Sequence, residues 1–168
     1  MGVLDINNLK TQVQSILKSA NTLTATKDLS SGLSTRVQRV LKVHPLRIPI
    51  EAISIPYVTM FVSNKDIEEL SIGGGGNNRT GTKRLGEVTL NIVGAVMNPI
   101  VTDIEDDLAS DEIEDLMENI EENLRANMNF NNAIDYHIPM KVSYFEEAYE
   151  EESVFRAGIL EIACKTYY

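Results

Sequence analysis

Residues 110–127, SDEIEDLMENIEENLRAN, decide the fold predicted for this chain. Apolar side chains recur in this stretch at the i, i+3, i+4 and i+7 spacing of one helical face. They are Ile113, Leu116, Met117, Ile120 and Leu124. We predict a helix from Asp111 to Asn127, with Ser110 as an N-cap that accepts a free amide of the first turn. The other face is acidic, so the helix needs an apolar surface to pack on.

The segments on either side of this helix alternate with period two, as half-buried strands do. Before it, one face carries Val88, Leu90, Ile92 and Val96, and the strand ends at Asn98-Pro99. After it, one face of a second strand carries Ile138, Met140, Val142 and Tyr144. The polar run 146–152 connects this strand to a third, residues 153–165. In the third strand the parity of the apolar residues changes at Gly158, which predicts a bulge.

The chain begins with a second amphipathic pattern, which predicts a helix over residues 5–20 with Asp5 as its cap. Its apolar stripe consists of Ile6, Leu9, Val13, Ile16, Leu17 and Ala20. Residues 22–34 are rich in Ser and Thr and are predicted to form a loop. Residues 36–44 fit either a strand or a helical turn, and the extended form is favoured because Val is abundant and Pro45 follows.

The middle of the chain is predicted to contain one strand and a long loop. The strand covers residues 57–62, which are rich in Val, Tyr and Phe. The loop covers residues 63–86 and includes the run GGGGNNRTGTKR at 73–84. Loops of this length are often functional in compact domains. Within it, Arg79, Lys83 and Arg84 are the candidate interface residues, and we expect residues 72–86 to dock on a neighbouring molecule.

Composition indicates one domain spanning residues 1–168. The chain is 43% hydrophobic but contains no Trp, so its core is mostly aliphatic. Its net charge of −10 disfavours binding to nucleic-acid phosphates. No apolar run approaches the ~20 residues that cross a bilayer, no signal peptide precedes the first helix, and the single Cys fits a reducing cytoplasm. Residues 36–47 are basic and residues 103–122 acidic, which suits either self-association or a surface dipole.

No residue pattern predicts a catalytic, cofactor or metal site. The Gly-rich run lacks the Lys-Ser/Thr pair of a phosphate loop, and no amphipathic helix follows it. The acids of residues 103–107 lack the Gly and closing Glu of a calcium loop. His44 and His137 have no metal-ligand spacing, and Cys164 is expected in the core unless the fold brings a His to it.

The order of these parts resembles the tail terminator (tail completion) proteins of long-tailed bacteriophages. The resemblance runs from about Asp5 to Thr166 and covers the first helix, the basic stretch and the strand IPYVTMFV at 55–62. It continues through the Gly-rich loop, the strand from Arg84 to Met97, the acidic helix and the closing FRAGILEI at 155–162. It consists of order, length and pattern, so it carries no site residue over.

The resemblance implies a structural virion protein rather than an enzyme. Such proteins form a homohexameric ring on the tail tube and join it to the head through a head-closure or neck protein. DNA passes through the ring without specific binding, and the particle assembles in the host cytoplasm. We therefore expect an α+β, ring-forming subunit, with a mainly antiparallel sheet of about four strands, two flanking helices and a long inter-strand loop. A head-closure or other connector protein, or a small enzyme that binds a phosphorylated ligand, are the alternatives.

Overall fold

The described part of the computed structural model folds as an α+β unit. It comprises residues 4–20, 24–28, 33–37, 39–48, 56–70, 83–99, 108–149 and 153–167. The helices are α1 (Ile6–Ser19), the 3-10 turn η1 (Pro45–Arg47) and α2 (Leu108–Arg125). The strands are β1 (Thr24–Asp28), β2 (Leu33–Arg36), β3 (Arg39–Leu41), β4 (Tyr57–Leu70), β5 (Lys83–Pro99), β6 (Tyr136–Tyr149) and β7 (Ser153–Tyr167).

The main sheet has five strands in the order β3-β4-β5-β7-β6, and β1 with β2 forms a separate hairpin. β3 runs parallel to β4, whereas the other three pairings are antiparallel. The sheet is therefore mixed and larger than the predicted four strands. The extended form favoured for residues 36–44 does contain β3. The predicted sheet of four strands left β3 out, because a parallel partner cannot be identified from local sequence.

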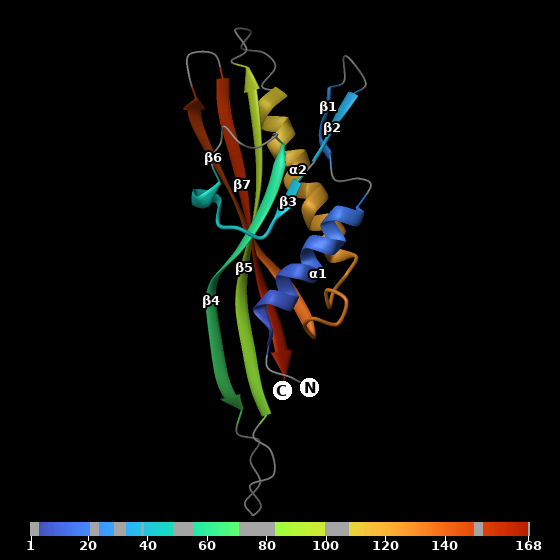
Figure 1. The fold of residues 1–168 in the computed structure, drawn as a ribbon, viewed down its shortest axis with the longest axis vertical. Helices are drawn as coiled ribbons and strands as arrows, with labels where there is room; N and C mark the ends of the chain where they lie inside the picture. The colour runs from blue at the N-terminus through green and yellow to red at the C-terminus, as the bar shows by residue number, and fades with distance from the viewer. Residues whose placement is uncertain are drawn as a thin grey trace, which may run out of the picture.

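The helices cover one face of the sheet, and η1 lies on the other (Figure 1). α1 and α2 contact each other; α1 reaches β3 and β4, and α2 reaches β5 and β7. The predicted stripes of both helices are buried here, together with alternate residues of the strands. Asp5 caps α1 as predicted, because its carboxylate accepts the backbone N–H groups of Asn7 at 2.9 Å and Asn8 at 3.1 Å.

The predicted bulge at Gly158 is wrong, because β7 pairs with β5 in an unbroken register. The two alternating sets of apolar residues in β7 instead point to opposite faces of the sheet. Leu160, Ile162 and Cys164 lie under the helices, and Phe155 and Ala157 belong to the opposite face. A strand that is buried on both faces therefore resembles one with a shifted register when it is read from sequence alone.

The register shift near the end of the chain lies in β6 instead, between Pro139 and Lys141. The extra residue, Met140, reverses the side-chain alternation. Ile138 pairs with Ala163, whereas Val142 and Tyr144 pair with residues that face α2. The prediction that these residues of β6 share one face is therefore wrong.

Several predicted boundaries also change. β4 extends to Leu70 and β5 starts at Lys83, so much of the predicted loop 63–86 is a two-stranded ribbon, and residues 71–82 lie outside the described part. β1 and β2 occupy much of the predicted loop 22–34, and β6 continues to Tyr149. α2 begins at Leu108, which places Ser110 inside its first turn rather than at the N-cap. In each case a strand or helix continues into polar sequence. Such sequence has no apolar periodicity, so the prediction ended the element too early or began it too late.

A second, smaller apolar cluster lies on the face opposite the helices. It contains Tyr57, Val93, Ala95 and Ala157, with Ile48, Phe61, Phe155 and Ile159 packed against it. The segment after β3 crosses this face, because the Thr59 hydroxyl donates a hydrogen bond to the Val43 carbonyl and the rings of His44 and Phe61 lie 4.4 Å apart. On this face the sheet is covered by the segment after β3, whereas two helices cover the other face.

Candidate assembly surfaces

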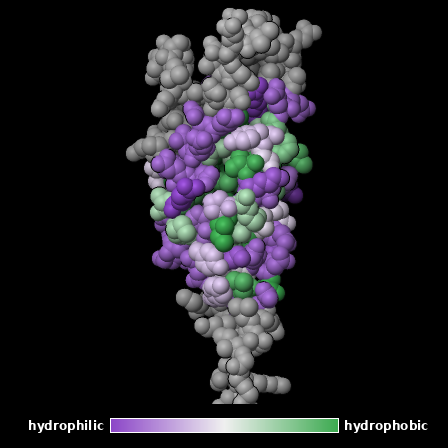
Figure 2. Space-filling model, turned by 180° about the vertical axis from the view of Figure 1, so that it is seen from behind, coloured by the Kyte–Doolittle hydropathy of each residue, from purple (hydrophilic) through white to green (hydrophobic). Residues whose placement is uncertain are grey.

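Exposed apolar side chains gather on two parts of the described chain. Val43 and Leu46 lie on the segment that follows β3 and crosses the face opposite the helices. Four more lie on β6: Ile138, Met140, Tyr144 and Phe145. Seen from behind, apolar side chains form separate islands in a mostly hydrophilic surface (Figure 2). Two separate exposed apolar groups on one subunit are a feature of subunits that contact two neighbours.

The backbone edges themselves are blunted against pairing with another strand. β6 carries Pro139, which cannot donate a hydrogen bond, and the bulge at Met140 follows directly. β4 has its own register shift between Val62 and Asn64, and exposed charges follow at Lys65 and Asp66. Bulges, Pro and charged residues discourage the addition of strands at an edge. We therefore expect molecules to contact each other at these edges through side chains rather than through backbone hydrogen bonds.

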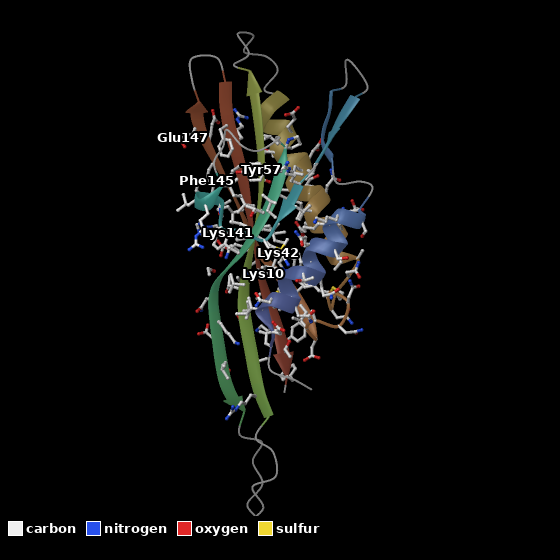
Figure 3. The ribbon with its side chains drawn as sticks, viewed as in Figure 1. Lys10, Lys42, Tyr57, Lys141, Phe145 and Glu147 are labelled. Carbon is white, nitrogen blue, oxygen red and sulfur yellow. The ribbon has the colours of Figure 1, made fainter. Side chains whose placement is uncertain are left out.

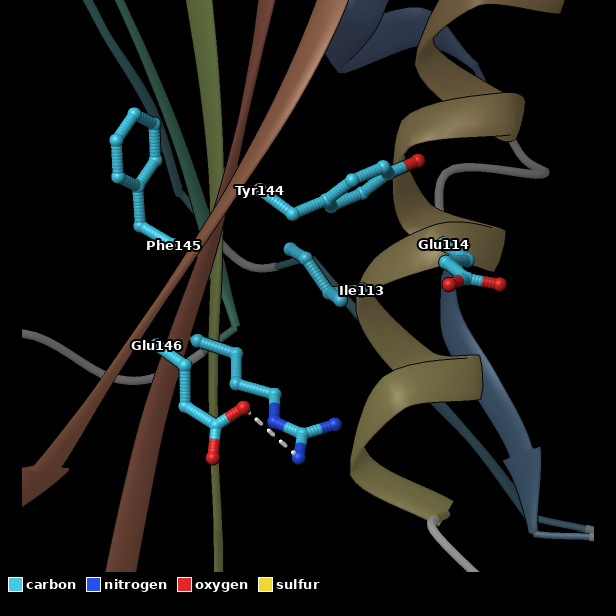
Figure 4. Close-up of a pocket in the computed structure, with 6 residues that line it drawn as sticks. Ile113, Glu114, Tyr144, Phe145 and Glu146 are labelled. Carbon is cyan, nitrogen blue, oxygen red and sulfur yellow. Dashed lines mark ion pairs between the residues drawn. The ribbon is translucent and has the colours of Figure 1, made fainter.

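A small hollow of about 190 Å³ lies between β6, β7 and the first turns of α2. Its lining residues are Ile113, Glu114, Tyr144, Phe145, Glu146 and Arg156. Tyr144 points toward α2, whereas the ring of Phe145 points to the other side of β6 (Figure 4). Phe145 and Glu147 lie on the side of the sheet away from the helices (Figure 3). The hollow thus combines an apolar wall with charged groups at its rim.

The charge around this hollow is predominantly negative. The guanidinium of Arg156 forms an ion pair with Glu146 at 3.1 Å, and Glu114 is a second acid of the lining. Partial burial raises the pKa of the Tyr144 hydroxyl above its usual value, and the charges of Glu114, Glu118 and Glu121 raise it further. A cation brought to this surface would be attracted, and a carboxylate repelled.

The turn η1 holds an exposed apolar side chain in a fixed position. Leu46 is 90% exposed, although its backbone N–H donates to His44 Nδ1 at 3.3 Å. The turn is closed by the N–H of Arg47 to the His44 carbonyl at 2.9 Å and that of Ile48 to the Pro45 carbonyl at 3.0 Å. The side chains of Leu46 and the exposed Arg47 therefore project from an ordered backbone.

Of the residues predicted as an interface, Lys83 and Arg84 lie at the start of β5, in its ribbon with β4. Arg79 falls outside the described residues, as does the side chain of Lys83. Arg84 is exposed on β5 and pairs in register with Glu69 of β4. The ribbon runs beyond the helices (Figure 1). Its position is compatible with a docking arm, and the structure does not bring Arg84 to the hollow.

The fold does bring a histidine to Cys164, because His137 and Cys164 are partners in register across β6 and β7. Both are buried, and burial raises the pKa of the Cys164 thiol to about 12. A nucleophilic thiol needs the opposite shift. His137 has a structural contact instead: its Nδ1 lies 2.9 Å from the Met128 carbonyl, and its ring stacks on Phe130 at 4.3 Å.

Among the described residues, no group of three or more His, Cys, Asp and Glu side chains could hold a metal ion. The acids of residues 103–107 lie outside this part of the chain. Neither α1 nor α2 is long and apolar enough to cross a membrane.

Comparison with known proteins assigns this chain to no family. The chain matches no protein-family model and no curated protein sequence.

Sequence reasoning missed both Leu46 and the hollow. Leu46 lies between Pro45 and the cation Arg47, in a stretch without periodicity, so its exposure gave no pattern. The hollow is built from three separate elements, and only adjacent aromatic residues, Tyr144 and Phe145, could have suggested it. In a strand, adjacent residues face opposite sides, so this pair placed one large side chain on each face.

Proposed function

We propose that this protein is a structural subunit of a phage virion, a tail terminator that caps the tail tube as a homohexameric ring and joins it to the head. The observation that carries the proposal is the presence of two separate groups of exposed apolar side chains, one on the segment that follows β3 and one on β6. Two different contact surfaces on one subunit produce a head-to-tail assembly, which closes into a ring when the rotation allows.

The order of the main elements supports the same proposal. The body consists of α1, the β4–β5 pair, α2 and the β6–β7 pair, as expected from the resemblance to tail terminators. The β4–β5 ribbon provides an extended arm for contact with a tail tube protein or with a head-closure or neck protein. In this proposal the protein acts by assembly rather than by catalysis, and its place is the tail or neck of the virion.

The net charge of −10 suits a ring that DNA passes through. Like charge opposes arrest of the DNA on the channel wall, so the duplex can pass without specific binding. The acids along α2 include Glu114, Glu118 and Glu122, whose side chains are exposed. These acids are the candidates for charge reversal, and reversal of wall residues is expected to slow DNA passage.

The decisive experiment omits this protein from phage assembly and images the particles by electron microscopy. Overlong tails without heads are expected if the protein terminates the tail tube. Filled heads that leak DNA would instead assign it to head closure, the related connector function. Normal particles would refute both assignments.

A second experiment tests the docking arm. Deletion of residues 73–81 is expected to leave the fold intact, as judged by circular dichroism, and to impair joining of heads to tails. If the deletion variant folds and heads still join tails normally, this segment is only a linker.

Calorimetry with ATP and inorganic phosphate tests the alternative, an enzyme that binds a phosphorylated ligand. That alternative predicts a measurable heat of binding.

A further inference from the structure

An exposed leucine on a rigid turn is well suited to bind a neighbour. Leu46 is held by the hydrogen bonds of η1, by the bond from Thr59 to Val43, and by the contact between His44 and Phe61. A side chain on an ordered backbone loses little freedom when it binds. The adjacent Arg47 is exposed and adds a positive charge beside the apolar group.

The hollow beside β6 has the complementary chemistry. Its buried Ile113 and half-exposed Tyr144 offer an apolar wall, and Glu114 is an exposed acid on its rim. The volume of about 190 Å³ accommodates a branched aliphatic side chain. Glu118 and Glu121 add negative potential near Tyr144, so a cation that accompanies the apolar group is favoured.

We propose that Leu46 of one copy inserts into the hollow lined by Ile113 and Tyr144 of a second copy, with Arg47 beside Glu114. This inference rests on the proposed function, and it names the contact through which neighbouring subunits join. The turn η1 and the hollow lie on opposite faces of the sheet, so a molecule can use both at once (Figure 1). Each subunit then contacts one neighbour through its leucine and another through its hollow.

The occupant is a second copy rather than an added strand. The edges of β4 and β6 are blunted by bulges, by Pro139 and by charges, so backbone pairing between molecules is disfavoured. Three exposed basic residues lie on β3 and on the segment after it, and their charge matches the acidic surface of α2: Arg39, Lys42 and Arg47. The same chain thus carries both halves of a complementary contact.

Cysteine cross-linking between two variants tests this contact directly. Leu46→Cys protein is mixed with Glu114→Cys protein at high concentration and oxidised with copper phenanthroline. The native Cys164 does not interfere, because it is the single cysteine of the chain, is buried and has a raised pKa. Glu122→Cys is the matched control: it is exposed on the same helix but about 12 Å further along the axis.

A disulfide-linked dimer is expected in the Leu46→Cys and Glu114→Cys mixture, with little from either variant alone or from the Glu122→Cys mixture. In parallel, Arg47→Glu is expected to weaken association about fivefold, as for one exposed charge pair. Addition of Glu114→Arg to that variant is expected to recover most of the loss, whereas Arg47→Lys changes little.

The remaining outcomes overturn the inference in distinguishable ways. Rings seen by electron microscopy without the cross-link would reject this contact and leave the proposed function in place. A dimer formed by Leu46→Cys protein alone would show a contact between two identical turns instead. Protein that stays monomeric at every concentration, and on tail tubes, would reject this inference together with the ring.

Discussion

Gly94 of β5 and Gly158 of β7 are direct partners across the sheet, beneath α2. A Cβ atom added at Gly158 would lie 2.5 Å from Met117 Cγ, and one added at Gly94 would lie 3.0 Å from Leu116 Cδ2 and Met117 Sδ. The two glycines therefore provide a flat site on which the side chains of α2 rest. Glycine inside a strand commonly marks such a close approach.

Replacement of these glycines is expected to destabilise the fold by overpacking. Gly158→Ala should cost about 1–3 kcal/mol of unfolding free energy, because Met117 Cγ is close to the helix backbone and cannot easily move. Gly94→Ala should cost less, since its neighbours are side-chain ends. Urea denaturation measures both values. Equal stability of Gly158→Ala and the native protein would contradict the close approach of α2.

Acidification is expected to destabilise the protein partly through His137. Burial lowers the pKa of His137 in the folded state, although its bond to the Met128 carbonyl opposes the shift. The unfolded chain therefore binds this proton at a higher pH than the folded protein does. The stability from neutral His137 is fully present above about pH 6.5 and is lost as the pH falls through the lower folded-state pKa.

The measurement compares unfolding free energies at pH 8 and pH 5 for the native protein and the His137→Gln variant. His137→Gln should show a weaker pH dependence of stability over this interval than the native protein. An unchanged pH dependence in His137→Gln would assign the effect to carboxylates instead.

Thr59→Val is expected to loosen η1. Thr59 is buried and its hydroxyl donates to the Val43 carbonyl, so the variant leaves a carbonyl without this donor at a cost of about 1–3 kcal/mol. Thr59→Ser retains the hydroxyl and serves as the control. Urea denaturation gives the stability, and the Leu46→Cys cross-link should form more slowly in the Val variant if η1 moves.

Asp5→Ala is expected to destabilise the start of α1 by about 1 kcal/mol, because two backbone N–H groups lose their carboxylate acceptor. Asp5→Asn keeps a side-chain oxygen and should retain most of the stability. Hydrogen exchange at the amides of Asn7 and Asn8 localises the effect, and unaltered exchange at both amides in the Ala variant would argue against the cap.

Both helices and the main antiparallel strands were predictable from sequence, because each carries a local pattern with a clear period. The stripe that includes Leu116 and Ile120 identifies α2, and Asp5 marks the start of α1. The pairing of strands that are far apart in the sequence produces no such local pattern. The bulge was therefore predicted at Gly158, although that glycine accommodates Met117 and the shift lies at Met140.

The candidate assembly surfaces were less predictable than the fold. Arg84 could be predicted as exposed because it lies in a polar, Gly-rich region. The exposure of Leu46 depends on the path of the chain across the sheet, and the hollow exists only once β6, β7 and α2 are packed. Surfaces made by tertiary packing combine residues that have no shared pattern in sequence.

The position of β7 has a consequence for a chain interrupted during synthesis. β7 follows the other described strands in sequence, yet it lies between β5 and β6 in the sheet. A chain that stops before β7 cannot join β6 to the β4–β5 pair, and the backbone edge of β5 that pairs with β7 stays without its partner strand. Such an interrupted chain therefore lacks the surface that α2, β6 and β7 form together.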